Sequence, residues 1–184
     1  MILSGMNILF LGSSVTYGSA AGGVSFVEIL AEKCGFRFVK EAVSGTTLAD
    51  INEKSYVARL KQLDSKMHFD LLVCQLSTND ATRNISIAQT ESAIRAIVSY
   101  AKETFACPIV FYTNPYYESK AYAELVVLLH ALSAELGFSV LDFYGKTVTE
   151  ADRAAYMADR IHPTKKGYGE WIAPTFEDFL KDLN

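Results

Sequence analysis

Residues 7–18 read NILFLGSSVTYG, and this stretch decides the fold class. Its first part, NILFL at positions 7–11, is an apolar run without a polar face, which predicts a strand covered on both sides of a parallel sheet. The small and hydroxyl-bearing residues from Gly12 to Gly18 predict a tight turn that lets the backbone approach a ligand and directs amide groups toward it. A functional site is therefore expected directly after the first strand.

Outward from this strand, short apolar runs alternate with longer amphipathic stretches. Four more runs predict strands, at residues 36–43, 69–76, 108–113 and 139–143, and the stretches between and after them predict helices at 25–34, 47–63, 85–105, 119–136 and 165–180. Ser25 and Glu28 form a capping-box pattern, and Gly35 and Gly137 fit helix C-termini. Alternating strands and helices predict a three-layer α/β/α sandwich with a five-stranded parallel sheet in the flavodoxin-like order 2-1-3-4-5. The whole chain, residues 1–184, is predicted to form one domain.

Ligands of such sheets bind beyond the carboxyl ends of the strands, so the turns after each strand carry the functional signal. The turn after the first strand lacks the GxxxxGK[ST] and GxGxxG patterns of phosphate loops, although a Ser/Gly-rich turn can also bind phosphate. Gly45 follows the second strand and offers a backbone amide, while Asn79 follows the third and offers a neutral side-chain donor. Ordinary turn and capping chemistry would also account for these two positions.

Near the C-terminus, Asp159 precedes His162 by three residues, and Pro163 restricts the backbone at the histidine. A carboxylate at this spacing reaches Nδ1 of the imidazole and leaves Nε2 free to take a proton from a hydroxyl. A nucleophilic serine needs such a base, an orienting acid and donors for the oxyanion. Because the fold places Ser14, Gly45, Asn79 and His162 at one edge of the sheet, we expect them to form a single catalytic site.

These four motifs together resemble the SGNH hydrolase superfamily, the GDSL-like lipases and acylhydrolases, over nearly the whole chain. The family pattern GDSxTxG corresponds to residues 12–18, the oxyanion glycine to Gly45, GxND to residues 77–80, and DxxHP to residues 159–163. The resemblance implies a triad of Ser14, His162 and Asp159. It also implies an oxyanion hole built from the Ser14 and Gly45 amides and the Asn79 side chain.

The chain departs from the family pattern at two positions. Ser13 replaces the aspartate of GDS, and Ser77 replaces the glycine of GxND. The first change affects the turn beside the nucleophile, and the second places a side chain close to Asn79. We also expect substrate contacts from Ser13, Tyr116 and Tyr117, although the two tyrosines fit equally well as residues packed beneath a loop.

Three other polar residues are interpreted as structural. His68 precedes a strand and His130 lies in a helical pattern, each without a partner in the sequence. Asp142 lies on the last strand, far in sequence from His162, so it is expected to fix a loop or cap instead of completing the triad.

Composition excludes several classes of protein. The formal net charge is −4 with both signs interspersed, which argues against nucleic acid as a partner, and no apolar run is long enough for a membrane span. The three cysteines lack metal-ligand spacing and fit buried, reduced thiols. With no secretory leader recognisable at the N-terminus, a cytoplasmic location is expected. The sequence does not predict an oligomeric state.

The expected function is hydrolysis of a short-chain ester, acetyl above all, on a small molecule or carbohydrate through an acyl-enzyme on Ser14. No metal and no organic cofactor is expected. Two alternatives remain open at this point. One is a thioesterase or acyltransferase with the same triad, and the other is a non-catalytic flavodoxin-like module that binds a nucleotide or phosphate at residues 13–18.

Overall fold

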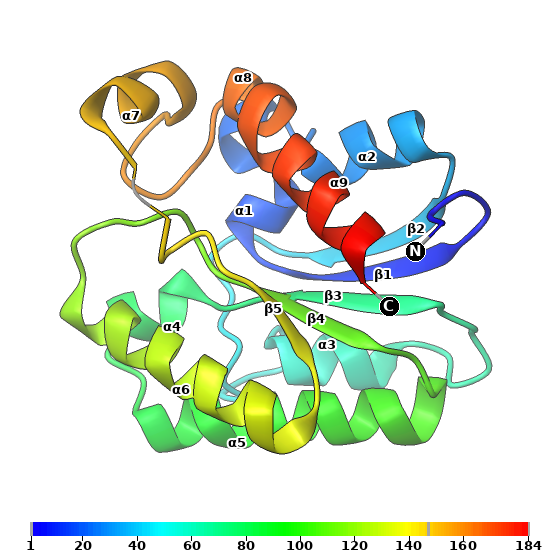
Figure 1. Cartoon of the computed structure of the whole chain (residues 1–184). Helices are drawn as coiled ribbons and strands as arrows, with labels where there is room; N and C mark the ends of the chain where they lie inside the picture. The colour runs from blue at the N-terminus through cyan, green and yellow to red at the C-terminus, as the bar shows by residue number, and fades with distance from the viewer. Residues whose placement is uncertain (1, 147, 184) are drawn as a thin grey trace.

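The structure is a computed structural model that describes residues 2–146 and 148–183, and a parallel sheet runs through its centre (Figure 1). The sheet has the order β2-β1-β3-β4-β5, and every neighbouring pair is parallel. Its strands are β1 (Asn7–Gly12), β2 (Arg37–Ala42), β3 (Leu71–Gln75), β4 (Ile109–Tyr112) and β5 (Ser139–Leu141). The predicted fold class and strand order are confirmed, and the strand ends differ from the prediction by at most two residues.

Helices cover both faces of the sheet, as Figure 1 shows. Side chains of a strand alternate between faces, so β1 sends Ile8 and Phe10 to one hydrophobic core and Leu9 and Leu11 to the other. The first core lies under α2 (Phe26–Cys34) and α9 (Ala173–Asp182), and the second lies under α3 (Tyr56–Gln62), α5 (Ile87–Tyr100) and α6 (Lys120–Leu136). This arrangement is the predicted three-layer sandwich.

Local signals placed several helix ends correctly. Ser25 and Glu28 form a complete capping box at the start of α2. Gly35 and Gly137 end α2 and α6 with φ angles of +73° and +69°, in the left-handed region that glycine enters without steric cost. The last predicted helix is interrupted, because α8 (Lys165–Gly167) passes through a π-helical turn, Tyr168–Ile172, into α9. A π-helical turn at Ala101–Phe105 likewise completes the helix predicted over residues 85–105.

The prediction of a helix over residues 47–63 is wrong for its first half. Only α3 forms, and residues 47–55 are irregular. The buried carboxylate of Asp80 accepts hydrogen bonds from the backbone amides of Leu48 and Ala49, at 2.8 and 2.9 Å. The side chain of Ser55 then caps α3 by accepting a bond from the Ala58 amide. These side chains compete with helix formation in the stretch before α3.

Among the described residues, three short α-helices were not predicted, nor was the 3-10 turn Ser19–Ala21. The helices are α1 (Ser14–Tyr17), α4 (Thr78–Thr82) and α7 (Glu150–Tyr156). The first two begin immediately after β1 and β3, within the segments whose composition predicts turns, because helices of four or five residues leave little periodicity in a sequence.

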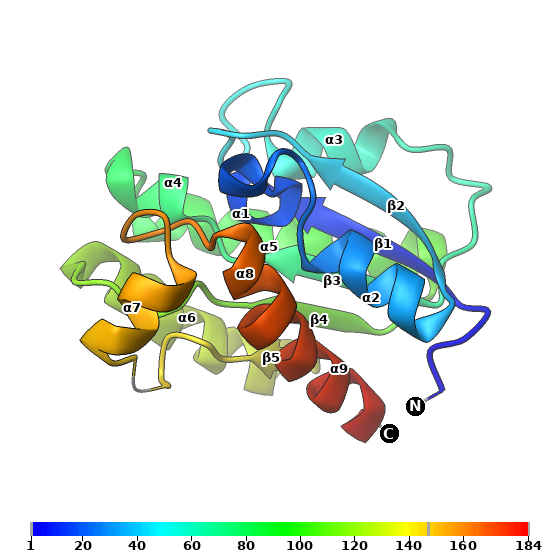
Figure 2. The ribbon, with the colours of Figure 1, turned by 90° about the horizontal axis from the view of Figure 1, so that it is seen from above.

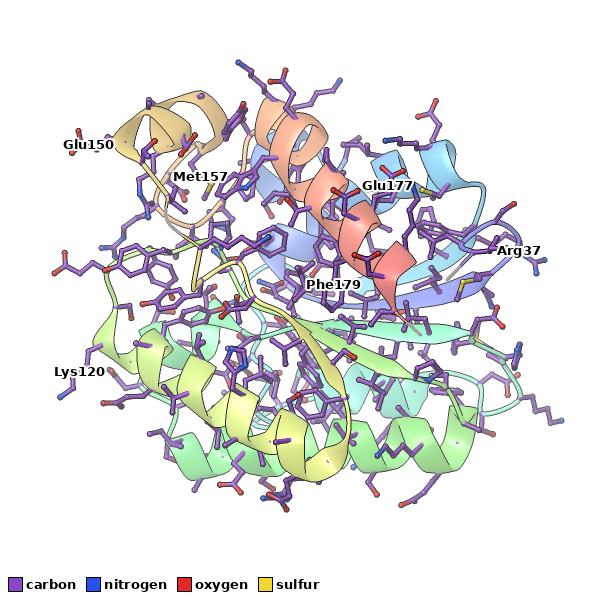
Figure 3. All side chains as sticks on the ribbon, in the orientation of Figure 1. Arg37, Lys120, Glu150, Met157, Glu177 and Phe179 are labelled. Atoms are coloured by element: carbon purple, nitrogen blue, oxygen red, sulfur yellow. The ribbon has the colours of Figure 1, made fainter. Side chains whose placement is uncertain are left out.

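Most charged side chains lie around the periphery of the fold. Figure 3 labels Arg37, Lys120 and Glu150, which point outward from different sides of the molecule and are all exposed. The cysteines carry free thiols, and burial raises the pKa of Cys107 to about 11. Within the described ranges, no helix combines the length and the apolar character needed to cross a bilayer.

One buried cation joins the strand ends that carry the candidate site. Arg59 on α3 is 7% exposed, and its guanidinium donates hydrogen bonds to the carbonyls of Gly12 and Glu41 and to Oγ1 of Thr46. Gly12 ends β1, and Glu41 is the next-to-last residue of β2. The guanidinium therefore ties the turn before Ser14 to the turn that holds Gly45.

The Arg59→Met substitution should destabilise the protein, because it leaves these three buried or partly buried acceptors without their donor. At roughly 1 kcal/mol for each acceptor, we expect the free energy of unfolding to fall by about 3 kcal/mol. For a chain of this size the melting temperature would fall by about 6 to 12 °C. Urea denaturation and thermal melting measure both quantities. Lys61→Met, an exposed position on the same helix, is the control, and equal stabilities of the two variants would contradict the prediction.

Candidate active site

Ser14 lies where β1 passes into α1, at the carboxyl edge of the sheet. It is the first residue of α1, which begins two residues after the end of β1. Its side chain and its amide therefore lie beyond the carboxyl end of that strand. Gly12 allows the tight turn, because a Cβ at that position would lie 1.8 Å from Oγ1 of Thr16. Figure 2, which views the molecule from above, shows the segment between α7 and α8 passing beside α1.

That segment brings His162 to the serine. Nε2 of His162 lies 2.8 Å from Oγ of Ser14, although 148 positions separate the two residues. Nδ1 lies 2.8 Å from Oδ2 of Asp159. Because a carboxylate only accepts hydrogen bonds, Nδ1 carries the proton and Nε2 accepts the bond from the serine hydroxyl. The three side chains thus form one continuous chain of hydrogen bonds.

Asp159 also holds its own loop. Its Oδ1 accepts hydrogen bonds from the backbone amides of Ile161 and His162, at 2.7 and 2.8 Å. Burial by itself raises the pKa of this carboxyl group, but the bonds from the His162 ring and from the two amides outweigh burial. The net pKa is lower than the ordinary value, so the carboxylate stays ionised beside the imidazole.

The histidine loop, residues 157–164 between α7 and α8, is held by hydrogen bonds at its ends and in its middle. The Ala158 amide donates to the His162 carbonyl at 2.8 Å, and Met157 pairs with Pro163 in an isolated β-bridge. Asn114, two residues after the end of β4, is fully buried and donates from Nδ2 to the Ile161 carbonyl at 2.9 Å. Asn114 was not predicted as a site residue, although its position after a strand at the same sheet edge was a usable signal.

Buried polar side chains form hydrogen bonds with the residues next to the nucleophile. Oε1 of Gln75 accepts hydrogen bonds from the Ser13 amide, from Oγ of Ser13 and from Oγ1 of Thr16. On the other side of α1, the Tyr168 hydroxyl donates to the Val15 carbonyl at 2.7 Å. These contacts join the short helix α1 to β3 and to the C-terminal helical segment, so Ser14 lies on a rigid support.

The expected substrate contact of Ser13 is contradicted, because this side chain is fully buried against Gln75. Tyr117 is also buried, at 2% exposure, and packs against Tyr122 and Tyr144. Tyr116 is exposed and its ring lies 5.1 Å from that of Tyr144. The packing interpretation therefore describes Tyr117, and neither tyrosine is among the residues that line the hollow around Ser14.

Three candidate donors for the oxyanion lie near the Ser14 hydroxyl, and one of them is the amide of Ser14 itself. The Ser14 amide lies in the first turn of α1, where backbone N–H groups have no partner within the helix. Gly45 has a φ of +78°, which presents its backbone in a conformation that other residues rarely adopt. Nδ2 of Asn79 donates one hydrogen to the Thr46 carbonyl at 2.9 Å, and its second hydrogen remains for a ligand. Ser14, Gly45 and Asn79 line one hollow together with His162. We call it the catalytic hollow.

The second departure from the family pattern has a structural explanation. Ser77 is fully buried, and its Oγ caps α4 by accepting a hydrogen bond from the Asp80 amide at 3.3 Å. Its side chain is thus engaged at the N-terminus of α4. Asp80 itself accepts bonds from Leu48, Ala49 and Thr90, which orders the segment after Gly45.

The remaining histidines have partners away from the catalytic hollow. Nε2 of His68 lies 3.2 Å from Asp70, just before β3, and His130 lies 3.1 Å from Asp142. Asp142 also accepts from the Thr113 hydroxyl and the Gly145 amide, which fits its expected role in a loop. Among residues 2–146 and 148–183, no group of three or more His, Cys, Asp or Glu side chains is arranged to hold a metal ion.

Solved structures share this architecture. A protein from Lactobacillus plantarum is 20% identical over 98% of this chain and 99% of its own length, with a TM-score of 0.84. An acetylxylan esterase from Geobacillus stearothermophilus is 20% identical, covering 100% and 98%, with a TM-score of 0.76. A lipase/acylhydrolase from Enterococcus faecalis is 22% identical, covering 96% and 95%, also with a TM-score of 0.76. At these identities the likeness shows a common fold.

Curated proteins give no significant match to this chain. The sequence pattern of the GDSL-like lipase/acylhydrolase family, in contrast, matches residues 10–169. This range runs from β1, through the turns that carry Ser14, Gly45 and Asn79, to the loop that carries His162. With its motifs in this order and its sheet in the order 2-1-3-4-5, the chain belongs to the GDSL-like lipase/acylhydrolase family of SGNH hydrolases.

Proposed function

We propose that this protein is a serine esterase that removes a short acyl group, acetyl above all, from a small molecule or carbohydrate. The observation that carries the proposal is the hydrogen-bonded chain from Ser14 through His162 to Asp159 at the rim of the catalytic hollow. The whole chain would act as one catalytic domain. Its family consists of enzymes that hydrolyse esters, and the finer assignments below rest on the geometry.

Each atom of the triad has a role in the proposed reaction. Oγ of Ser14 attacks the carbonyl carbon of the ester while Nε2 of His162 takes its proton. The tetrahedral oxyanion lies against the Ser14 amide, the Gly45 amide and Nδ2 of Asn79. His162 then protonates the leaving alkoxide, and an acyl group remains on Ser14. Water, deprotonated by His162, releases the acid and restores the serine.

Asp159 is proposed as the residue that makes His162 an effective base. Its carboxylate fixes the tautomer with the proton on Nδ1 and stabilises the imidazolium that forms when Ser14 loses its proton. The two backbone amides that hold Oδ1 leave Oδ2 directed at the ring. The lowered pKa of this group supports the role, because the carboxylate has to remain charged while the histidine is protonated.

The lining of the catalytic hollow favours a short acyl group. The hollow has a volume of about 350 Å³, and short side chains, those of Ser19, Ser44, Thr78 and Thr82, make up much of its lining. Ile161 contributes a large apolar side chain, whereas long acyl chains need an extended apolar surface. The acetylxylan esterase of the same fold gives a precedent for acetyl esters on carbohydrate.

Substitution of the nucleophile and the base tests the mechanism directly. Ser14→Ala and His162→Ala should each lower kcat for p-nitrophenyl acetate by at least roughly 10³-fold, because neither variant can form the acyl-enzyme efficiently. A fluorophosphonate should label Ser14 in the wild type and should fail to label Ser14→Ala. The matched control is His68→Ala, which removes a histidine paired with a carboxylate at the opposite edge of the sheet. Activity of the wild-type level in either triad variant would refute the mechanism, and a protein without labelling or turnover would support the phosphate-binding alternative.

The lowered pKa of Asp159 predicts a pH-dependent contribution to stability. Its folded pKa lies below the unfolded value of about 3.9, so the stabilisation is present above that pH and is lost as the pH falls through the folded pKa. We therefore expect the difference in unfolding free energy between wild type and Asp159→Asn to shrink from about pH 5 to about pH 3. Urea denaturation across this range measures the difference. A gap that stays constant to the acid limit would show that the carboxylate is not stabilised by its three donors.

An acyl-length series tests the substrate class. With p-nitrophenyl esters from acetate to decanoate, kcat/KM should be highest for acetate or butyrate and at least roughly tenfold lower for decanoate, because Ile161 is the one large apolar side chain among the described residues that line the hollow. The corresponding acetyl thioester, assayed beside the oxygen ester, compares esterase with thioesterase activity. A rising kcat/KM with chain length would overturn the short-acyl assignment while leaving the triad in place.

A further inference from the structure

A second hollow adjoins the catalytic one on the far side of the Gly45 turn. It has a volume of about 350 Å³, and its wall includes Ser44, Gly45, Asn52, Glu53, Lys54 and Arg83. Ser44 and Gly45 also line the catalytic hollow, so the two hollows share a wall. We call the second one the basic hollow. A substrate bound at Ser14 that extends past Gly45 would enter it.

Arg83 is held at the boundary between the two hollows. Its Nη2 donates a hydrogen bond to the Gly45 carbonyl at 2.7 Å. A Cβ built on Gly45 would lie 3.8 Å from the same nitrogen, so the guanidinium packs directly against the glycine. A guanidinium has five N–H donors, and this bond uses one of them. The other N–H donors of the Arg83 guanidinium are exposed, and the bond to the Gly45 carbonyl already holds this group in position.

The charges around the basic hollow are not balanced by ion pairs. Among the residues that the structure describes, no carboxylate lies within 4.0 Å of Arg83 or Lys54, so neither charge is neutralised by an ion pair within the fold. Glu53 is the acidic residue of the wall, which leaves two cations against one anion in a protein of net charge −4. A negatively charged group on a ligand would balance the excess positive charge of this wall.

We propose that the basic hollow binds an anionic group, such as a carboxylate, on the alcohol portion of the ester substrate. This inference rests on the proposed esterase function and specifies its substrate class. A planar guanidinium and a nearby ammonium match a carboxylate through charge-assisted hydrogen bonds, and Asn52 adds a neutral polar side chain. Arg83 and Lys54 are thus specificity-determining residues. They do not take part in the chemical step.

The alcohol portion is the part of the substrate that reaches this hollow. A short acyl group ends within the catalytic hollow, close to the carbonyl carbon that Ser14 attacks. A larger group on the ester oxygen can extend past the shared wall of Ser44 and Gly45 into the basic hollow. The natural substrate is therefore inferred to be a short-chain ester of an acidic hydroxy compound, for example an acetylated acidic sugar.

The test compares two acetyl esters that differ in charge, 4-acetoxybenzoate and its neutral methyl ester. The measured quantity is the ratio of kcat/KM for the anionic ester to that for the neutral one, so that any general effect on the oxyanion turn cancels. We expect this ratio to fall roughly fivefold in Arg83→Gln and also to fall in Lys54→Gln, as for loss of a partly exposed ion pair. The wild-type ratio should also decrease as salt is raised from about 0.02 to about 0.5 M.

Lys66→Gln is the matched control for net charge. Lys66 is exposed and precedes β3, at the edge of the sheet opposite Ser14, so its loss changes the total charge without touching either hollow. Its ratio should equal that of the wild type. An unchanged ratio in Arg83→Gln and Lys54→Gln, with Ser14-dependent turnover of the neutral ester intact, would overturn the basic hollow as an anion site and leave the esterase function standing. Absence of Ser14-dependent turnover of both esters would refute the proposed function and this inference with it.

A second pair of esters places the charge on the acyl side. Monoethyl adipate and ethyl hexanoate differ only in the terminal carboxylate, and acid release measures their hydrolysis. If Arg83→Gln changes the ratio for this pair and leaves the acetoxybenzoate ratio unchanged, the assignment to the alcohol portion is wrong. Dependence on Arg83 in the acetoxybenzoate pair alone supports it.

Discussion

The arrangement of the site depends on one buried guanidinium. Arg59 donates to the carbonyl of Gly12, to the carbonyl of Glu41 and to the hydroxyl of Thr46, so a single side chain of α3 links the ends of β1 and β2 with the Gly45 turn. Burial lowers the pKa of this group, but its ring contact with Tyr56 and its carbonyl acceptors compensate a cation inside the fold. This bridge adds to the hydroxyl contact between Ser19 and Ser44, at 2.6 Å, and to the bond from the Val43 amide to the Gly12 carbonyl, which also join the nucleophile turn to the oxyanion turn.

Two further contacts extend this rigidity to the rest of the site. Asp80 fixes the segment after the Gly45 turn through the amides of Leu48 and Ala49, and Asn114 fixes the histidine loop through the Ile161 carbonyl. In each case a buried side chain binds backbone groups of a loop that would otherwise be free to move. A hydroxyl and an imidazole from distant parts of the chain can lie 2.8 Å apart because both loops are anchored to the same sheet edge.

Ser13 and Ser77 stand where the family pattern has an aspartate and a glycine. Ser13 points into the core, where Gln75 binds its amide and its hydroxyl, and Ser77 caps α4. Neither side chain enters the catalytic hollow. The positions that line the hollow, Ser14, Gly45, Asn79 and His162, keep the residue types of the family pattern. Both departures from the family pattern thus lie outside the hollow, where each serine side chain forms a local hydrogen bond.

The sequence by itself determined the features that depend on local patterns. Apolar runs located the five strands, glycine and capping residues located helix ends, and the four motifs located Ser14, Gly45, Asn79 and the Asp159 to His162 pair. Tertiary structure alone decided that residues 47–55 are irregular, that Ser13 faces the core and that Arg59 is buried. These outcomes depend on partners tens of positions away, such as Gly12 for Arg59 and Gln75 for Ser13. Local composition does not record such partners, because the low-dielectric pocket that favours each contact exists only after the sheet has assembled.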